Sequence, residues 1–158
     1  MAGLDRISVA GGIALAVTAV ALYAWTGFSP VPPGPSSLGV ISGYTLVTAL
    51  VALWIVPLFG RRSPPGGPRG RFQAFHRLLG IAFVVLLAVH ARSGGHDILL
   101  AMGVLAPVMA LVAFFHAQVQ AANKPALLVA WWVVHLGLAT ALSVMAILHV
   151  YAQYAYST

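Results

Sequence analysis

Long apolar runs alternate with short polar segments along the whole chain. Each run approaches the roughly 20 residues that a helix needs to cross a bilayer. The pattern predicts an all-α integral membrane bundle, in which residues 1–158 form a single transmembrane helical domain. Five transmembrane helices are expected, at about residues 7–27, 38–59, 72–91, 97–117 and 126–152.

The polar segments between the runs predict an orientation. With five spans, the N-terminus and the loops at 60–71 and 118–124 share one side. Positive residues are enriched on the cytoplasmic side of membrane proteins. Seven of the eight Lys and Arg residues belong to the shared side: Arg6, Arg61, Arg62, Arg69, Arg71, Arg77 and Lys124. We therefore expect the N-terminus inside and the C-terminus outside, in a bacterial cytoplasmic membrane, and four helices without the first would keep this orientation.

Composition narrows the class of protein further. The chain is 61% hydrophobic and 6% charged, which is typical of a membrane protein and not of a soluble domain. It has no cysteine, which excludes disulfides, iron–sulfur clusters and thiolate ligands. Asp5 and Asp97 are its only carboxylate side chains, which disfavours paired-carboxylate catalysis. The net charge of +6 is explained by membrane topology, and no nucleic acid partner is expected.

Two pairs of histidines interrupt apolar runs at the same spacing. His76 and His90 lie fourteen residues apart in one helix, and His135 and His149 repeat that spacing in the last helix. Fourteen residues rotate a helix by about 1400°, close to four turns, so each pair shares one face and spans about 21 Å. Because one helix intervenes, the two helices should run parallel. His76 then faces His135 near the inside, and His90 faces His149 near the outside.

Two facing imidazoles at each of two levels suit two bis-histidine b-type haems, in which porphyrin fills an apolar slot between helices. Gly80 and Ala139, one turn after His76 and His135, would leave room for the macrocycle. Arginine next to a ligand position can pair with a haem propionate. The candidate cofactor-binding residues are His76, His90, His135, His149, Arg77, Arg92 and Gly80, with the four histidines as iron ligands.

Other interpretations of the histidines stay open. A single intramembrane histidine often makes a hydrogen bond between helices or belongs to a proton relay, but the duplicated spacing favours haem. A zinc or copper site is disfavoured, because each level offers two histidines and no thiolate or carboxylate. His116 is expected to complement the helix dipole at the inner end of the fourth run, with a role in a quinone or substrate pocket as the alternative. Trp131 and Trp132 are typical of interfacial belt residues.

The segments FHRLLGIAFVVLLAVH (75–90) and WWVVHLGLATALSVMAILH (131–149), separated by one helix, resemble ferric-reductase-like transmembrane cytochrome b domains. This family includes NADPH oxidases, ferric reductases and the haem subunit of methionine sulfoxide reductase systems. The resemblance covers about residues 38–152 and implies two stacked b haems that carry electrons across the membrane. The family's sixth helix and flavin domain have no counterpart, and no G-x-G-x-x-G fingerprint occurs. Electrons are therefore expected to pass to or from a separate partner.

The expected function is that of a membrane di-haem cytochrome b, in contact with lipid and with a redox partner protein or quinone, as a subunit of a redox complex. This favours an electron-transfer oxidoreductase subunit and leaves enzymatic activity of the chain itself undecided. The alternative is a non-redox assembly or transporter-like subunit whose histidines bond between helices. For His76 and His135 to share a haem, their depths must match. Either the last helix projects about 9 Å beyond the start of the 72–91 helix, or that helix begins earlier, within PRGR (68–71).

Overall fold

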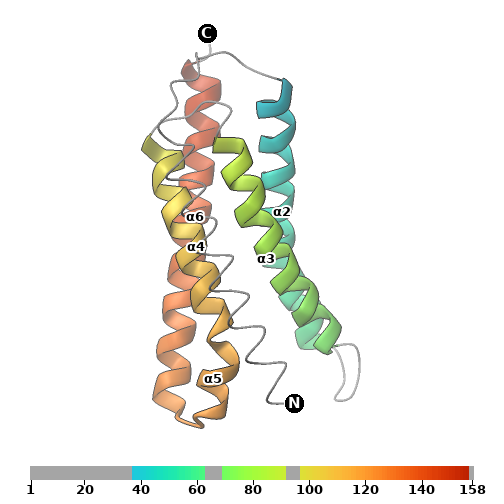
Figure 1. Cartoon of the computed structure of the whole chain (residues 1–158), viewed down its shortest axis with the longest axis vertical. Coiled ribbons are helices and arrows are strands. Elements are labelled where there is room, and N and C mark those ends of the chain that lie inside the picture. The colour runs from blue at the N-terminus through green and yellow to red at the C-terminus, as the bar shows by residue number, and fades with distance from the viewer. Residues whose placement is uncertain (1–36, 63–68, 92–96, 157–158) are drawn as a thin grey trace.

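The computed structural model describes residues 37–62, 69–91 and 97–156, which are helical except at short turns. The helices, shown in Figure 1, are α2 (Ser37–Arg62), α3 (Arg69–Ala91), α4 (Asp97–Phe114), α5 (His116–Ala121) and α6 (Pro125–Tyr156). Four spans in this part of the chain are long and apolar enough to cross a membrane. The all-α architecture is thus confirmed for the described residues, and the chain has the character of a multi-pass membrane protein. The predicted span at 7–27 lies outside them.

The helix boundaries follow from local sequence signals. α3 begins at Arg69, three residues before the predicted start, and so includes the RGR sequence. This is one of the two arrangements expected to bring His76 and His135 to the same depth. α6 begins at Pro125, a residue whose fixed φ suits the first turn of a helix. Asn123 has a positive φ of 50° in the turn before it, a conformation that asparagine tolerates better than most residues. α6 then continues to Tyr156, beyond the predicted end at 152.

The fourth apolar run is not one continuous helix, which corrects the predicted helix at 97–117. α4 ends at Phe114 and α5 begins at His116, with Phe115 between them. The Phe115 N–H donates to the Val112 carbonyl at 3.2 Å, a tighter bonding pattern than that of an α-helix. Phe115 keeps a right-handed helical backbone conformation, and the short α5 that follows packs beside α6.

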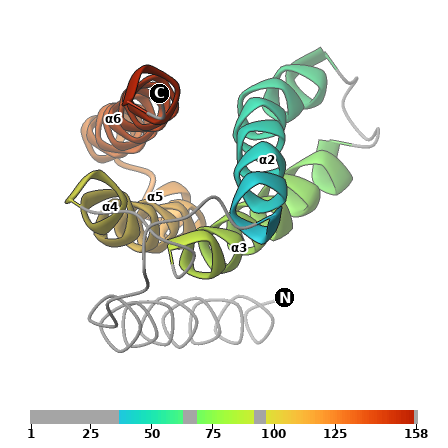
Figure 2. The same ribbon diagram turned by 90° about the horizontal axis from the view of Figure 1, so that it is seen from above.

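The helices are arranged as neighbours along an arc. α2 packs on α3, α3 on α4 and α4 on α6, as Figure 2 shows from above. α2 and α6 form the two ends of this arc. α3 and α6 run in the same direction, so the two helices that carry the histidine pairs are parallel, as the sequence predicts.

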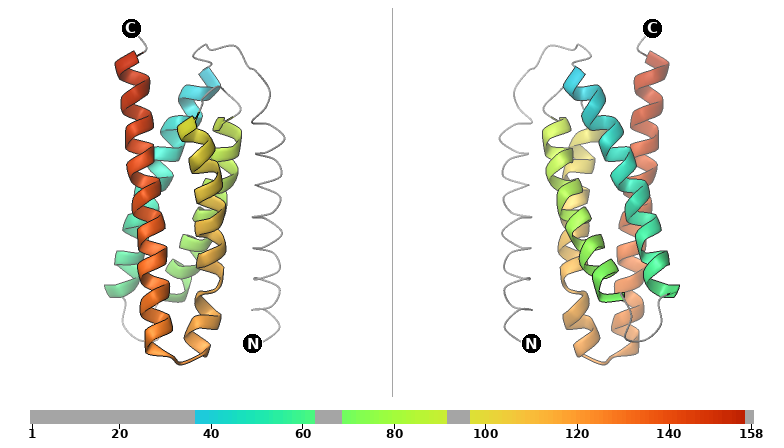
Figure 3. Two further views of the ribbon diagram at one scale, coloured as in Figure 1. Left: turned by 90° about the vertical axis from the view of Figure 1, so that its left-hand side faces the viewer. Right: turned by 90° about the vertical axis from the view of Figure 1, so that its right-hand side faces the viewer.

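The buried core lies mainly along α2, α3 and α4, whereas α6 runs along one side of the bundle in both views of Figure 3. α6 contributes a single residue, Leu142, to the fully buried set. Large apolar side chains on the outside are about two-thirds exposed, among them Ile41 at 64%, Val133 at 66% and Ile147 at 67%. Such surfaces suit lipid as the surrounding solvent. The core residues are Leu46, Ala49, Leu53, Phe83, Val84, Leu87, Leu99, Met102, Ala106, Met109 and Leu142.

Candidate functional site

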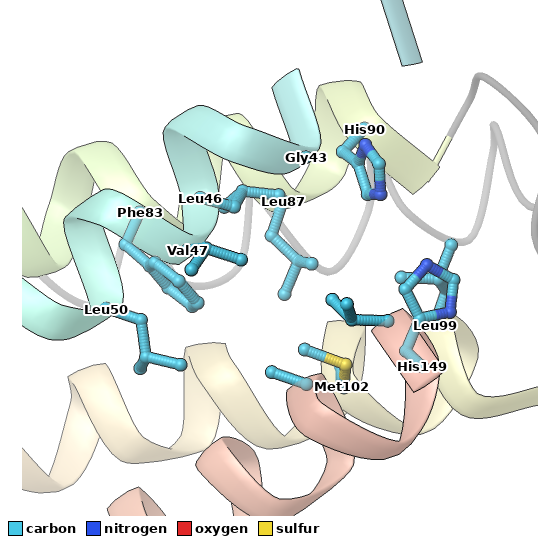
Figure 4. Close-up of a pocket in the computed structure, with 12 residues that line it drawn as sticks. Gly43, Leu46, Val47, Leu50, Phe83, Leu87, His90, Leu99, Met102 and His149 are labelled. Atoms are coloured by element: carbon cyan, nitrogen blue, oxygen red, sulfur yellow. The ribbon is translucent and has the colours of Figure 1, made fainter. Parts of the chain in front are cut away.

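The structure brings His90 of α3 and His149 of α6 together near one end of the bundle. We call this pair the His90 level. Their ring centroids are 5.9 Å apart, and the ring planes are nearly perpendicular, at 89°. Figure 4 shows both rings at the edge of a cavity between the helices. Residues 59 positions apart in sequence thus meet at the level that the histidine spacing predicts.

The cavity beside the His90 level is almost entirely apolar. It has room for about 40 Å³ of water-sized space and is partly open to the surroundings. Side chains from α2, α3, α4 and α6 all reach it (Figure 4). An apolar wall of this kind keeps water away from the imidazoles and lowers the local dielectric. The lining residues are Gly43, Leu46, Val47, Leu50, Phe83, Leu87, His90, Leu99, Met102, Ala146, His149 and Val150.

Two small residues of α2 hold the His90 ring in place. The Ser42 hydroxyl lies 2.9 Å from His90 Nδ1 and donates to the Gly39 carbonyl at 3.1 Å. A Cβ atom on Gly43 would lie only 3.2 Å from His90 Cε1, so glycine is the residue that fits against this ring. Sequence reasoning missed both residues. The available signal was a serine and a glycine side by side in an apolar span.

His76 of α3 and His135 of α6 form the second pair, which we call the His76 level. The two side chains lie close enough for their charges to interact. Each has a buried Nδ1 atom with no hydrogen-bond partner in the structure. Buried polar groups are nearly always paired, and the exceptions concentrate at redox and ligand sites. At the His76 level, two polar ring nitrogens are therefore buried and have no hydrogen-bond partner from the protein.

Aromatic rings surround the His76 level. Trp131 stacks on His135 with centroids 5.0 Å apart and an interplanar angle of 7°. Trp131 also contacts the ring of His116, with centroids 4.4 Å apart, and Trp132 packs edge-on against it at 5.1 Å. The Trp131 indole N–H donates to the Val112 carbonyl at 2.7 Å, so this half-buried ring links α6 to α4. Trp131 is expected to be an interfacial belt residue, but it also packs on His135 and bonds to α4. His116 begins α5 and does not end the fourth helix.

Three further residues are predicted to belong to the cofactor sites: Arg77, Gly80 and Arg92. Arg77 is exposed, and its charge reaches both His76 and His116. Gly80 faces α2, where an added Cβ would meet only the Leu53 side chain at 4.0 Å, so its role beside a cofactor stays a prediction. Arg92 lies outside the described residues.

The donor set of the two levels fits a metal held by two imidazoles. The rings of His90 and His149 face each other edge-on across the two helices, with centroids 5.9 Å apart. Within the described ranges, no three His, Cys, Asp or Glu side chains gather into a metal-binding cluster. The sites offer pairs, as axial haem ligation uses.

Comparison with family models, curated proteins and solved structures found no match to this chain.

Proposed function

We propose that this chain is a membrane di-haem b-type cytochrome that carries electrons across the bilayer as part of a redox complex. The observation that carries the proposal is the pair of histidine levels on two parallel spanning helices. At one level the two imidazoles stand 5.9 Å apart beside an apolar cavity. At the other, two buried imidazole nitrogens lack hydrogen-bond partners. Paired imidazoles in apolar surroundings are the donor set that a b haem uses, and the resemblance to ferric-reductase-like cytochromes b supports the same cofactor.

The four histidines would hold the two haem irons, His90 with His149 and His76 with His135. A bound b haem supplies reversible one-electron chemistry at its iron. The protein's own part is to set ligand orientation, dielectric and access of water. Buried Phe83 and Leu87 exclude water at the His90 level. The guanidinium of Arg77 lies where it would balance a propionate near His76.

The proposed orientation follows from the positive charges at one end of the bundle. α2 ends and α3 begins in segments that carry Arg61, Arg62, Arg69 and Arg71, and Lys124 lies in the turn before α6 at the same end (Figure 1). Positive residues favour the cytoplasmic side. The His76 level would then lie near the cytoplasmic face, within reach of a redox partner protein or quinone, and the His90 level would lie near the outer face.

Two observations favour the alternative of a non-redox subunit with interhelical histidine bonds. The backbone of Leu53 in α2 bonds to His76 of α3. Ser42 of α2 does bond to His90 of α3 at 2.9 Å, as that alternative expects. Interhelical bonding does not account for the two buried Nδ1 atoms of the His76 level, which have no partner. Haem binding would give all four histidines the same role, that of iron ligand.

A visible absorbance spectrum of the purified full chain separates the two functions. Protein made under haem-replete conditions should show a Soret band, and dithionite should produce the sharp α-band of a bis-histidine b haem. A variant with all four level histidines changed to alanine is the control and should lack both bands. A colourless wild-type protein would overturn the proposal in favour of the non-redox subunit.

A further inference from the structure

The Ser42 hydroxyl of α2 contacts a histidine of α3, unlike the two threonine hydroxyls that follow it in α2. Thr45 and Thr48 also donate to carbonyls of their own helix, those of Ile41 and Tyr44, but both are exposed. The Ser42 hydroxyl is half-buried and faces α3, where it lies 2.9 Å from His90 Nδ1. It therefore connects a backbone carbonyl of one helix to an imidazole of the next.

The protons of this arrangement can be counted. A serine hydroxyl has one proton, and Ser42 directs it to the Gly39 carbonyl at 3.1 Å. Its oxygen then faces His90 Nδ1 as an acceptor, so Nδ1–H is the donor. The contact with Ser42 therefore favours the tautomer of His90 that is protonated on Nδ1.

We propose that Ser42 is a positioning residue that fixes the tautomer and orientation of His90 and thereby tunes the electron affinity of the metal bound there. In this tautomer Nε2 carries the lone pair that a metal takes. Gly43 supports the same orientation, because its missing side chain admits the ring edge at 3.2 Å from the Cβ position. The inference rests on the proposed function, since the metal would be the haem iron of the His90 level.

The tuning should apply to one level only. An acceptor on Nδ1–H raises the basicity of an imidazole ligand and stabilises the oxidised metal. Ser42 contacts His90, whereas the backbone hydrogen bond of His76 comes from Leu53. Ser42 should therefore lower the reduction potential of the His90-level haem and leave that of the His76 level unchanged.

The first experiment is a potentiometric titration of the full chain with both haems bound. Ser42→Ala should raise the midpoint potential of the His90-level haem and shift its low-spin electron paramagnetic resonance signal, with the other haem unaffected. Ser42→Thr, which keeps the hydroxyl, should restore the wild-type values. Thr45→Ala is the matched control and should change neither haem. Unchanged potential and signal in Ser42→Ala would overturn the proposal.

A second measurement does not depend on haem. ¹⁵N nuclear magnetic resonance of His90 in the haem-free full chain should show the Nδ1–H tautomer, and Ser42→Ala should shift it toward the Nε2–H form. Finding Nε2–H in the wild type would overturn the role of Ser42 even if both haems bind. A chain that shows the Nδ1–H tautomer but never binds haem would instead overturn the proposed function, and with it the redox role of Ser42.

Discussion

The two histidine levels share one spacing but differ in what surrounds them. At the His90 level the partners come from α2, where Ser42 contacts the ring and Gly43 makes room for it. At the His76 level the neighbours are aromatic rings of α5 and α6, and Trp131 lies flat against His135. Both levels thus have a hydrogen bond from α2, since the Leu53 backbone bonds to His76, and the second level adds the stacking of Trp131 on His135.

The same histidine spacing therefore gives two sites with different surroundings. The fourteen-residue repeat places both pairs on facing sides of α3 and α6, but it says nothing about the neighbours that other helices supply. A hydroxyl acceptor and a stacked indole affect an imidazole ligand differently, because one acts on its basicity and the other on its packing and dielectric. The two levels should therefore have distinct spectra, potentials and sensitivities to mutation.

The largest expected effect comes from removing a ligand. His90→Ala and His149→Ala should each abolish or convert the same haem, and His76→Ala and His135→Ala should each do so for the other. Each single variant should therefore lose about half of the bis-histidine signal, as measured by absorbance and electron paramagnetic resonance. Coupling of His76 with His149 would mean that the two levels are wrongly paired.

Trp131→Ala should weaken the His76 level selectively. The change removes the stacked face of His135, the contact with His116 and the hydrogen bond to the Val112 carbonyl. Because the ring is half-buried, we expect a loss of about 2 kcal/mol in the free energy of unfolding, below the cost for a fully buried tryptophan. Thermal unfolding in micelles checks this, with Val133→Ala, on the exposed face, as the control. An equal effect on both haems would contradict the division into two levels.

Gly43→Ala should perturb the His90 level with a smaller effect. The new methyl group would lie 3.2 Å from His90 Cε1, so the ring must move by a few tenths of an ångström. We expect a shifted spectrum for that haem alone. Gly137→Ala is the matched control, because nothing lies within 4 Å of its Cβ position, and alanine there should be neutral or stabilise the helix by up to about 1 kcal/mol. Identical spectra for the two variants would speak against close seating of His90 on α2.

Trp54→Phe should have the smallest effect and touch neither level. The Trp54 indole N–H donates to the Ser143 hydroxyl at 3.0 Å, a bond between α2 and α6. Its loss should cost about 1 kcal/mol in the free energy of unfolding. Ser143→Ala should cost a similar amount, and the double variant should cost less than the sum, as expected for two partners in one bond. Strict additivity would show that the bond contributes nothing.

The helices and the two histidine pairs could be predicted from the sequence, but the side chains that contact the histidines could not. The spans could be predicted because apolar length alone decides whether a helix can cross a bilayer, and the parallel course of α3 and α6 follows from counting helices. The break at Phe115 could not, since the run remains apolar through it. The contact between Ser42 and His90 depends on how α2 is rotated against α3, over 48 residues of sequence, and only packing sets that rotation. The same rotation leaves Gly80 facing Leu53.

The ratio of haem to chain tests the central claim most directly. Pyridine haemochromogen analysis of the purified full chain, with protein measured by amino-acid analysis, should give two b haems per chain. The His90→Ala/His149→Ala variant should give one, and the variant lacking all four histidines should give none. A wild-type ratio of zero, or a ratio that does not respond to loss of either level, would contradict the account of two haem-binding levels.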